Sequence, residues 1–132
     1  MVEQNDIKIG VTGATGRMGV TLIRQISETP GFCLVAASEI SGHAMLGRDA
    51  GEVAGGAALS VAVSDDSDAL FAASDAVLDF TLPIATTDHA EGAARHGTAL
   101  IIGTTGIAAE QQGALARAGE KTAIVQAPNM SL

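Results

Sequence analysis

The sequence predicts an α/β fold in which about six parallel strands form a doubly wound sheet with helices on both faces. Two observations favour this fold. Short apolar runs alternate with amphipathic segments along the whole chain, and the first run ends in a glycine-rich turn. Such alternation is typical of βαβ units, because parallel strands need a crossover connection between them. Two mononucleotide-binding halves of this kind predict the strand order 3-2-1-4-5-6 of the Rossmann arrangement.

The individual elements follow from the apolar periodicity. Strands are expected at residues 7–11, 32–37, 59–63, 76–80, 99–102 and 122–126. Helices are expected at residues 17–28, 65–73, 83–96 and 108–118. Pro83 suits the first turn of the third helix and Gly97 its end. Residues 39–58 show no period, so they are expected to form a long functional or mobile loop with room for one short helical turn.

The glycine-rich turn carries the strongest functional signal. Gly13, Gly16 and Gly19 form a G-x-x-G-x-x-G pattern, with Ala14 where the commonest fingerprint has its first glycine. In such a turn the first glycine permits a tight bend, the second lets the backbone approach a phosphate, and the third lets helix and strand pack closely. The following helix N-terminus attracts anions. The turn therefore predicts a pyrophosphate site, in which Arg17 either contacts a phosphate or is a solvated helix start.

An acidic residue strengthens this hypothesis. Glu39 ends the second apolar run about 20 positions after Gly19, where a carboxylate accepts hydrogen bonds from an adenosine ribose. A 2′-phosphate there would repel Glu39, and Ile40 offers no positive charge beside it. The sequence therefore predicts NADH or NADPH as cofactor, with NADH favoured, and Arg48 is the residue that would favour NADPH.

The composition fits one globular domain and excludes several function classes. Hydrophobic residues make up 47% and charged residues 17% of the 132 residues, enough to bury a core. The net charge of −8 argues against nucleic acid or an anionic membrane as partner. No apolar run approaches a membrane span and the polar N-terminus is unlike a signal peptide, so a cytoplasmic location is expected. The single Cys33 lies in an apolar run and is expected to be a buried core thiol.

Polar and glycine-rich segments follow the predicted strands. They occupy residues 12–13, 38–39, 79–81, 103–106 and 127–129. Ligands of open parallel sheets bind at the carboxyl ends of strands, although turns need such residues in any case. Asp79 either orients a ribose or caps a turn. His43, His89 and His96 follow no strand and are expected to be surface or partly buried residues, so neither a metal site nor a proton donor is expected among them.

Four motifs together resemble the 4-hydroxy-tetrahydrodipicolinate reductase (dihydrodipicolinate reductase) family. They are residues 13–19 (GATGRMG), 79–81 (DFT), 102–106 (IGTTG) and 127–131 (APNMS). The resemblance covers residues 7–132 and implies the NAD(P)H-binding domain of an enzyme of the diaminopimelate route to lysine. It places the cofactor contacts on Gly13, Ala14, Thr15, Gly16, Arg17, Met18, Glu39, Gly103, Thr104, Thr105, Ala127, Pro128, Asn129 and Met130. Met130 stands where an aromatic is common in the family.

The resemblance also implies a division of labour. In the family a second domain carries the substrate-binding and proton-donating His and Lys residues, and residues 1–132 correspond to the cofactor domain alone. This chain is therefore expected to hold no catalytic residue and to bind the cofactor without turnover. The full-length family enzyme is expected to be a homotetramer that reduces a small dicarboxylate heterocycle.

Two other function classes remain open from the residues alone. One is a different Rossmann dehydrogenase, although the chain has no Tyr for short-chain dehydrogenase chemistry. Its one thiol, Cys33, lies early in a strand, which is the wrong place for the nucleophile of an aldehyde-type dehydrogenase. The other class is a non-catalytic dinucleotide sensor.

Overall fold

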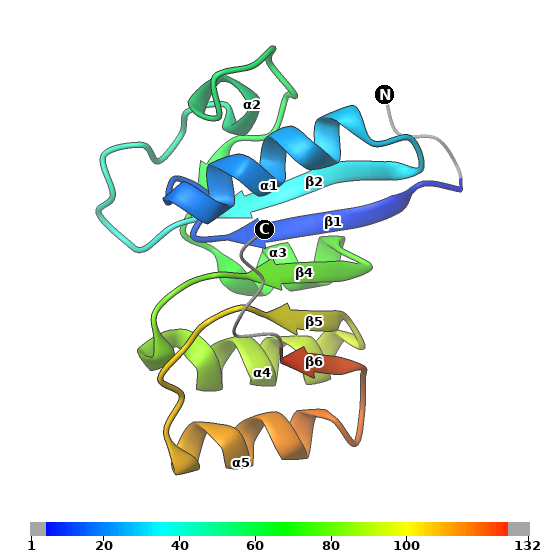
Figure 1. Ribbon diagram of the computed structural model, residues 1–132, viewed down its shortest axis with the longest axis vertical. Helices are drawn as coiled ribbons and strands as arrows, with labels where there is room; N and C mark the ends of the chain where they lie inside the picture. The colour runs from blue at the N-terminus through cyan, green and yellow to red at the C-terminus, as the bar shows by residue number, and fades with distance from the viewer. Residues whose placement is uncertain (1–4, 127–132) are drawn as a thin grey trace.

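The computed structural model describes residues 5–126, which form a six-stranded parallel sheet with helices on both faces (Figure 1). The strands are β1 (Ile7–Thr12), β2 (Phe32–Ser38), β3 (Val63–Ser64), β4 (Ala76–Asp79), β5 (Ala99–Ile102) and β6 (Ile124–Gln126). The helices are α1 (Arg17–Glu28), α2 (Ala50–Val53), α3 (Ser67–Ala73), α4 (Thr86–His96) and α5 (Ala109–Ala118), and a 3-10 turn η1 (Pro83–Ala85) precedes α4. The strand order is β3-β2-β1-β4-β5-β6, as the sequence predicts.

Each face of the sheet has its own apolar core. On one face, Ile9, Val11 and Leu34 pack with Ile23 and Ile26 of α1. On the other face, α3, α4 and α5 contribute to a second cluster that is built mainly from small and aliphatic residues. In Figure 1, α1 lies in front of the sheet and α3 behind it. None of the helices within residues 5–126 is both long and apolar enough to cross a membrane.

The register brings the ends of three strands together. Thr12, the last residue of β1, pairs with Ser38 on one side and with Asp79 on the other. The order of the sheet reverses between β1 and β4, because β2 and β3 continue in one direction and β4 to β6 in the other. The carboxyl ends of β1, β2 and β4 therefore meet at the switch point where open α/β sheets bind ligands.

The third strand is where the predicted elements differ most from the structure. A strand at residues 59–63 was expected, but only Val63–Ser64 pairs with β2. The backbone N–H groups of Leu59 and Val61 donate instead to the carboxylate of Asp49, at 3.0 Å each. The Asp49 side chain therefore takes the N–H groups of residues 59 and 61, which a longer β3 would have used for strand pairing.

Other differences lie at element boundaries or in burial. The helix expected from residue 65 begins at Ser67, because Asp66 caps it and accepts a hydrogen bond from Ala69 N at 3.0 Å. The last strand begins at Ile124 rather than 122, because Thr122 N still bonds to Ala118 O of α5. Cys33 is half-buried rather than a core thiol, so that prediction was wrong.

Candidate functional site

The glycine turn leaves β1 through Gly13, whose φ of +65° lies in the left-handed region that glycine adopts most easily. A Cβ on Gly19 would lie 2.2 Å from Gly13 O, so only glycine lets α1 approach the turn this closely. Gly16 is different. It is exposed, and the nearest atom to a Cβ there would be Gly13 O at 3.4 Å, an ordinary contact. Two of the glycines thus shape the turn, and Gly16 presents bare backbone to the surroundings.

The first turn of α1 is open to an anion. Gly16 is its N-cap and makes no side-chain capping bond, and the first turn contains no acidic residue. Arg17, the first helical residue, is exposed, whereas Met18 is half-buried. Ala14 is fully buried, and its backbone N–H donates to Ser38 O at 3.1 Å, which ties the turn to the end of β2. The helix end combines unpaired N–H groups with the positive end of the helix dipole.

A cavity of about 520 Å³ opens beside this turn at the carboxyl ends of β1, β2 and β4. Its lining includes Gly13, Gly16, Ser38, Glu39, Thr81 and His89. Three exposed apolar side chains, Ile40, Leu82 and Ile84, also line it. The cavity thus combines the predicted pyrophosphate turn and the predicted ribose acceptor in one site with an apolar rim.

The Glu39 carboxylate, which follows β2, is hydrogen-bonded to the glycine turn that follows β1. Its Oε2 accepts hydrogen bonds from Thr15 N at 2.9 Å and from Thr15 Oγ1 at 2.6 Å. Its other oxygen, Oε1, lies 3.3 Å from Ile40 N. The sequence predicted the carboxylate at this place but not its attachment to Thr15. The Oε2 contacts fix its orientation, and Oε1 retains acceptor capacity beside the cavity.

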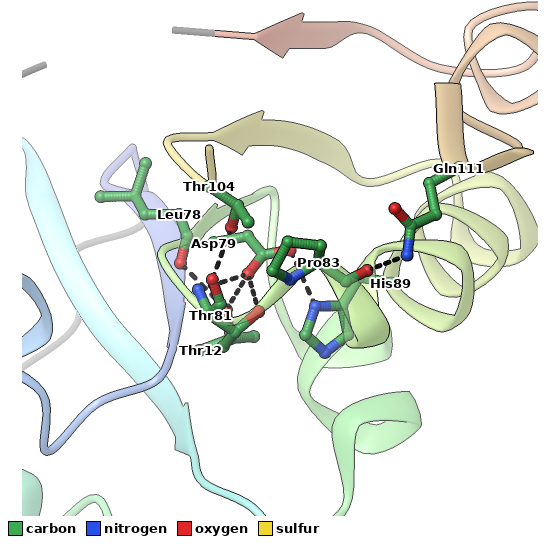
Figure 2. A network of polar contacts seen from close by, with 8 residues as sticks. All are labelled: Thr12, Leu78, Asp79, Thr81, Pro83, His89, Thr104 and Gln111. Carbon is green, nitrogen blue, oxygen red and sulfur yellow. Dashed lines mark hydrogen bonds and ion pairs between the residues drawn. The ribbon is translucent and has the colours of Figure 1, made fainter. Parts of the chain in front are cut away.

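Asp79 is the centre of a buried polar network (Figure 2). Its side chain is fully buried, and Oδ1 accepts from Thr12 Oγ1 at 2.9 Å, Thr81 N at 3.2 Å and Thr81 Oγ1 at 2.6 Å. Oδ2 lies 2.8 Å from His89 Nδ1. Burial alone would raise the pKa of Asp79, but the contact with His89 and the two hydroxyls lower it below its usual value. Asp79 thus caps the turn after β4 and also anchors α4.

His89 is a residue whose role the sequence did not reveal. It is 7% exposed, so it is buried rather than a surface or partly buried residue, and the prediction was wrong. It lines the cavity although it follows no strand, and its ring lies near Phe71, with centroids 5.8 Å apart. No local pattern marks this pair, because strand and helix packing alone brings positions 79 and 89 together. His96, on the same helix, contacts the exposed Asp68 instead, at 3.0 Å.

The glycine–threonine turn after β5 is packed against the turn after β4. A Cβ on Gly103 would lie 2.0 Å from the ring of Phe80, so the ring occupies the place of a side chain. Thr104 is buried, and its hydroxyl donates to Thr81 O at 2.9 Å (Figure 2). Thr105 is exposed. The predicted contacts Ala127, Pro128, Asn129 and Met130 lie outside the described residues.

The glycine turn that opens α1, the acidic residue that ends β2 and the cavity at the switch point define a dinucleotide-binding domain of the Rossmann type. A family model described as dihydrodipicolinate reductase, N-terminus, matches residues 7–130. The chain belongs to this family, as the four motifs indicate. This membership argues against the other dehydrogenase families considered from the sequence.

Known relatives agree with this assignment. The chain is 44% identical over 131 residues to the 4-hydroxy-tetrahydrodipicolinate reductase of Sinorhizobium medicae, covering 99% of this chain and 48% of the relative. It is 49% identical over 124 residues to the enzyme of the same name from Ruegeria pomeroyi, covering 94% and 46%. The chain thus spans about half the length of the curated relatives it matches.

Solved structures support the fold. A dihydrodipicolinate reductase from Paenisporosarcina sp. TG-14 superposes with a TM-score of 0.74 at 24% identity, over 94% of this chain and 48% of that one. A Rex-family repressor superposes with a TM-score of 0.67 at 15% identity, over 93% of this chain and 53% of that one. At these identities the likeness concerns the fold alone.

Proposed function

We propose that this chain is the NAD(P)H-binding domain of a 4-hydroxy-tetrahydrodipicolinate reductase, which acts in the diaminopimelate route to lysine. The observation that carries the proposal is the meeting of the bare Gly16 backbone and the Glu39 carboxylate in one cavity at the switch point. The reductase name shared by the relatives, which are 44% and 49% identical to this chain, supports the reaction class.

Each part of the site has a role in this proposal. Within the turn from Gly13 to Met18, the N–H groups of Ala14, Thr15 and Gly16 already donate inside the protein, so those of Arg17 and Met18 at the start of α1 hold the pyrophosphate. Glu39 accepts from the adenosine ribose. The turn at Gly103, Thr104 and Thr105 borders the nicotinamide, with Thr104 acting through its backbone because its hydroxyl is bonded to Thr81 O. Ala127, Pro128, Asn129 and Met130 complete the contacts. When bound, the nicotinamide would supply a hydride, and the residues of this site would orient the nicotinamide ring.

In this proposal, substrate binding and proton donation belong to a second domain of the whole enzyme. The relatives are about twice as long, which supports a separate substrate domain in the whole enzyme. A ring dicarboxylate requires cationic or N–H donors. Among residues 5–126, the cavity lining contains Glu39 and Asp65 but neither Lys nor Arg. We propose a cytoplasmic homotetramer for the full-length enzyme, on the family resemblance.

The 132-residue chain should bind NADH saturably without oxidising it. Binding the cofactor alone does not accelerate hydride transfer, because the substrate must be held against the nicotinamide carbon. His89 reaches the cavity, but its Nδ1 is committed to Asp79. The chain has no Trp, so NADH's own fluorescence reports binding and its absorbance reports turnover. Substrate-dependent oxidation of NADH at enzyme-like rates would refute this assignment of roles.

NADH should bind more tightly than NADPH, by about 1–2 kcal/mol, the scale of a hydrogen bond to a charged group. A 2′-phosphate would lie against the Glu39 carboxylate, and the neighbouring Ile40, 72% exposed, cannot offset the repulsion. Titrations of both cofactors at moderate salt measure the difference. The matched variant Glu39→Gln should narrow it, because the repelling charge is removed. Tighter NADPH binding by the wild-type chain would contradict the expected preference, and Arg48 would then be the first residue to replace.

A further inference from the structure

Besides Glu39, a second side chain of the loop between β2 and α2 contacts the glycine turn, that of His43. The imidazole is half-buried and makes a contact with each of its nitrogens. Nδ1 lies 3.0 Å from Met45 N, within the loop. Nε2 lies 3.1 Å from Thr15 Oγ1, in the glycine turn. His43 therefore joins the loop to the residue that holds Glu39.

The partners fix where the protons lie. A backbone N–H can only donate, so Met45 donates and His43 Nδ1 accepts. Because Nδ1 carries no hydrogen, the neutral ring carries its proton on Nε2 and donates it to Thr15 Oγ1. The hydroxyl has a single hydrogen, and it points to Glu39 Oε2, 2.6 Å away, because a carboxylate only accepts. The chain of donors runs in one direction, from Met45 through His43 and Thr15 to Glu39.

This chain of hydrogen bonds determines which Glu39 oxygen faces a ligand. Both Thr15 bonds end on Oε2, so Oε1 keeps only the 3.3 Å contact with Ile40 N. Without a donor from His43, the Thr15 hydroxyl would still donate to Oε2, but the Thr15 side chain would be held by one contact fewer. Hydrogen bonds in such chains also polarise one another, so the donor from His43 strengthens the bond to Glu39.

We propose that His43 is a positioning residue for the adenosine half of the dinucleotide site, acting through Thr15 to hold Glu39 with Oε1 available to the ribose hydroxyls. The inference rests on the proposed function, since it assumes that Glu39 meets the ribose. It assigns a role to the loop that the sequence left without one. The two hydrogen bonds of His43, with Met45 and Thr15, both lie at the adenosine end of the proposed site.

The loop has a second anchor that is independent of His43. Asp49 accepts hydrogen bonds from Glu52 N, Leu59 N and Val61 N, at 3.1, 3.0 and 3.0 Å. These bonds lower the pKa of its carboxyl, that from Leu59 most, although burial opposes the shift. The two ends of the segment around His43 are also held by backbone bonds, from Glu39 N to Ser64 O and from Gly47 N to Val63 O, each at 2.8 Å. A variant at position 43 therefore probes the link to Thr15 rather than the fold.

Two substitutions distinguish the roles of the two ring nitrogens of His43. The amide nitrogen of Gln can take the place of Nε2 and donate to Thr15, whereas the amide of Asn reaches only the position of Nδ1. His43→Asn should weaken binding of NADH about threefold to tenfold, the size of one neutral hydrogen bond, and His43→Gln should recover most of that loss. The same loss is expected with ADP-ribose, which lacks the nicotinamide. Thr15→Val should weaken NADH binding at least as much as His43→Asn, because it removes the hydroxyl that contacts both His43 and Glu39.

A double variant with Glu39→Ala gives the decisive comparison, because Ala removes the acceptor of the Thr15 bonds whereas Gln would keep one. If His43 acts through Glu39, His43→Asn should cause no further loss of affinity in the Glu39→Ala background. Thermal unfolding followed by circular dichroism confirms that each variant is folded. Equal affinities of the wild type, His43→Asn and Thr15→Val, with a loss in Glu39→Ala, would overturn the role of His43 and leave the proposed function intact. Absence of NADH binding by the wild-type chain would overturn the proposed function itself.

Discussion

Gly16→Val should lower NADH affinity at least about 100-fold while the domain remains folded, because loss of two charge-assisted hydrogen bonds is of this size. In the proposed binding mode, the valine side chain would occupy the space that the pyrophosphate enters to reach the N-terminus of α1. The fold tolerates the change, since Gly16 has extended backbone (φ −72°, ψ 169°) and a Cβ there meets only an ordinary contact. NADH fluorescence measures affinity, and far-ultraviolet circular dichroism measures folding.

Gly19→Ala is the matched control for this substitution. A Cβ at Gly19 would lie 2.2 Å from Gly13 O and 2.9 Å from backbone atoms of Ala14, so the added methyl forces α1 away from the turn. This variant should lose thermal stability as well as affinity, whereas Gly16→Val loses affinity alone. Unchanged affinity in a folded Gly16→Val chain would show that the pyrophosphate lies elsewhere.

Asp79→Ala should destabilise the domain by about 3–5 kcal/mol, because several donors lose their shared acceptor and each unsatisfied buried group costs about 1–3 kcal/mol. The change removes the acceptor of Thr12, Thr81 and His89 at once, at a carboxylate that is itself fully buried. A loss of this size is a large part of the stability of a typical domain. Urea unfolding of the two proteins measures it. Asp75, whose exposed carboxylate accepts a hydrogen bond from Lys8 N, provides the matched control, and Asp75→Ala should cost several-fold less.

The lowered pKa of Asp79 also predicts an acid dependence of stability. Because the folded-state pKa lies below the unfolded value of 3.8, the ionised carboxyl stabilises the fold above that pH. The contribution is lost as the pH falls from 3.8 through the lowered pKa. The difference in unfolding free energy between wild type and Asp79→Asn should therefore shrink below pH 3.8. A difference that does not change with pH would show that the carboxyl titrates normally.

The sheet order and most elements were predictable from the sequence because they depend on repeated local signals. β1 and β5 are apolar runs, α1 has one apolar face, and Gly97 in the left-handed conformation ends α4. The extent of the third strand was not predictable from the sequence. The path of the chain there depends on the Asp49 side chain, which binds the Leu59 amide ten positions further along the sequence. A side chain that captures backbone N–H groups leaves no periodic signature.

The candidate site divides in the same way. Glu39 and the three glycines could be placed from spacing alone, since the turn and the strand end are both local features. The contacts of His89 with Asp79 and of His43 with Thr15 could not be predicted, because they join segments whose packing is fixed by the whole sheet. Sequence motifs marked the groups proposed to meet the dinucleotide, whereas the residues that hold those groups in place become visible only in the structure.

The most direct test of the central claim is a calorimetric titration of the wild-type chain with NADH, beside Gly16→Val and Glu39→Gln. We expect one site per chain for the wild type, weaker binding for Glu39→Gln and no measurable binding for Gly16→Val. Absence of binding heat for the wild-type chain at millimolar NADH, or equal affinities of all three proteins, would contradict the account.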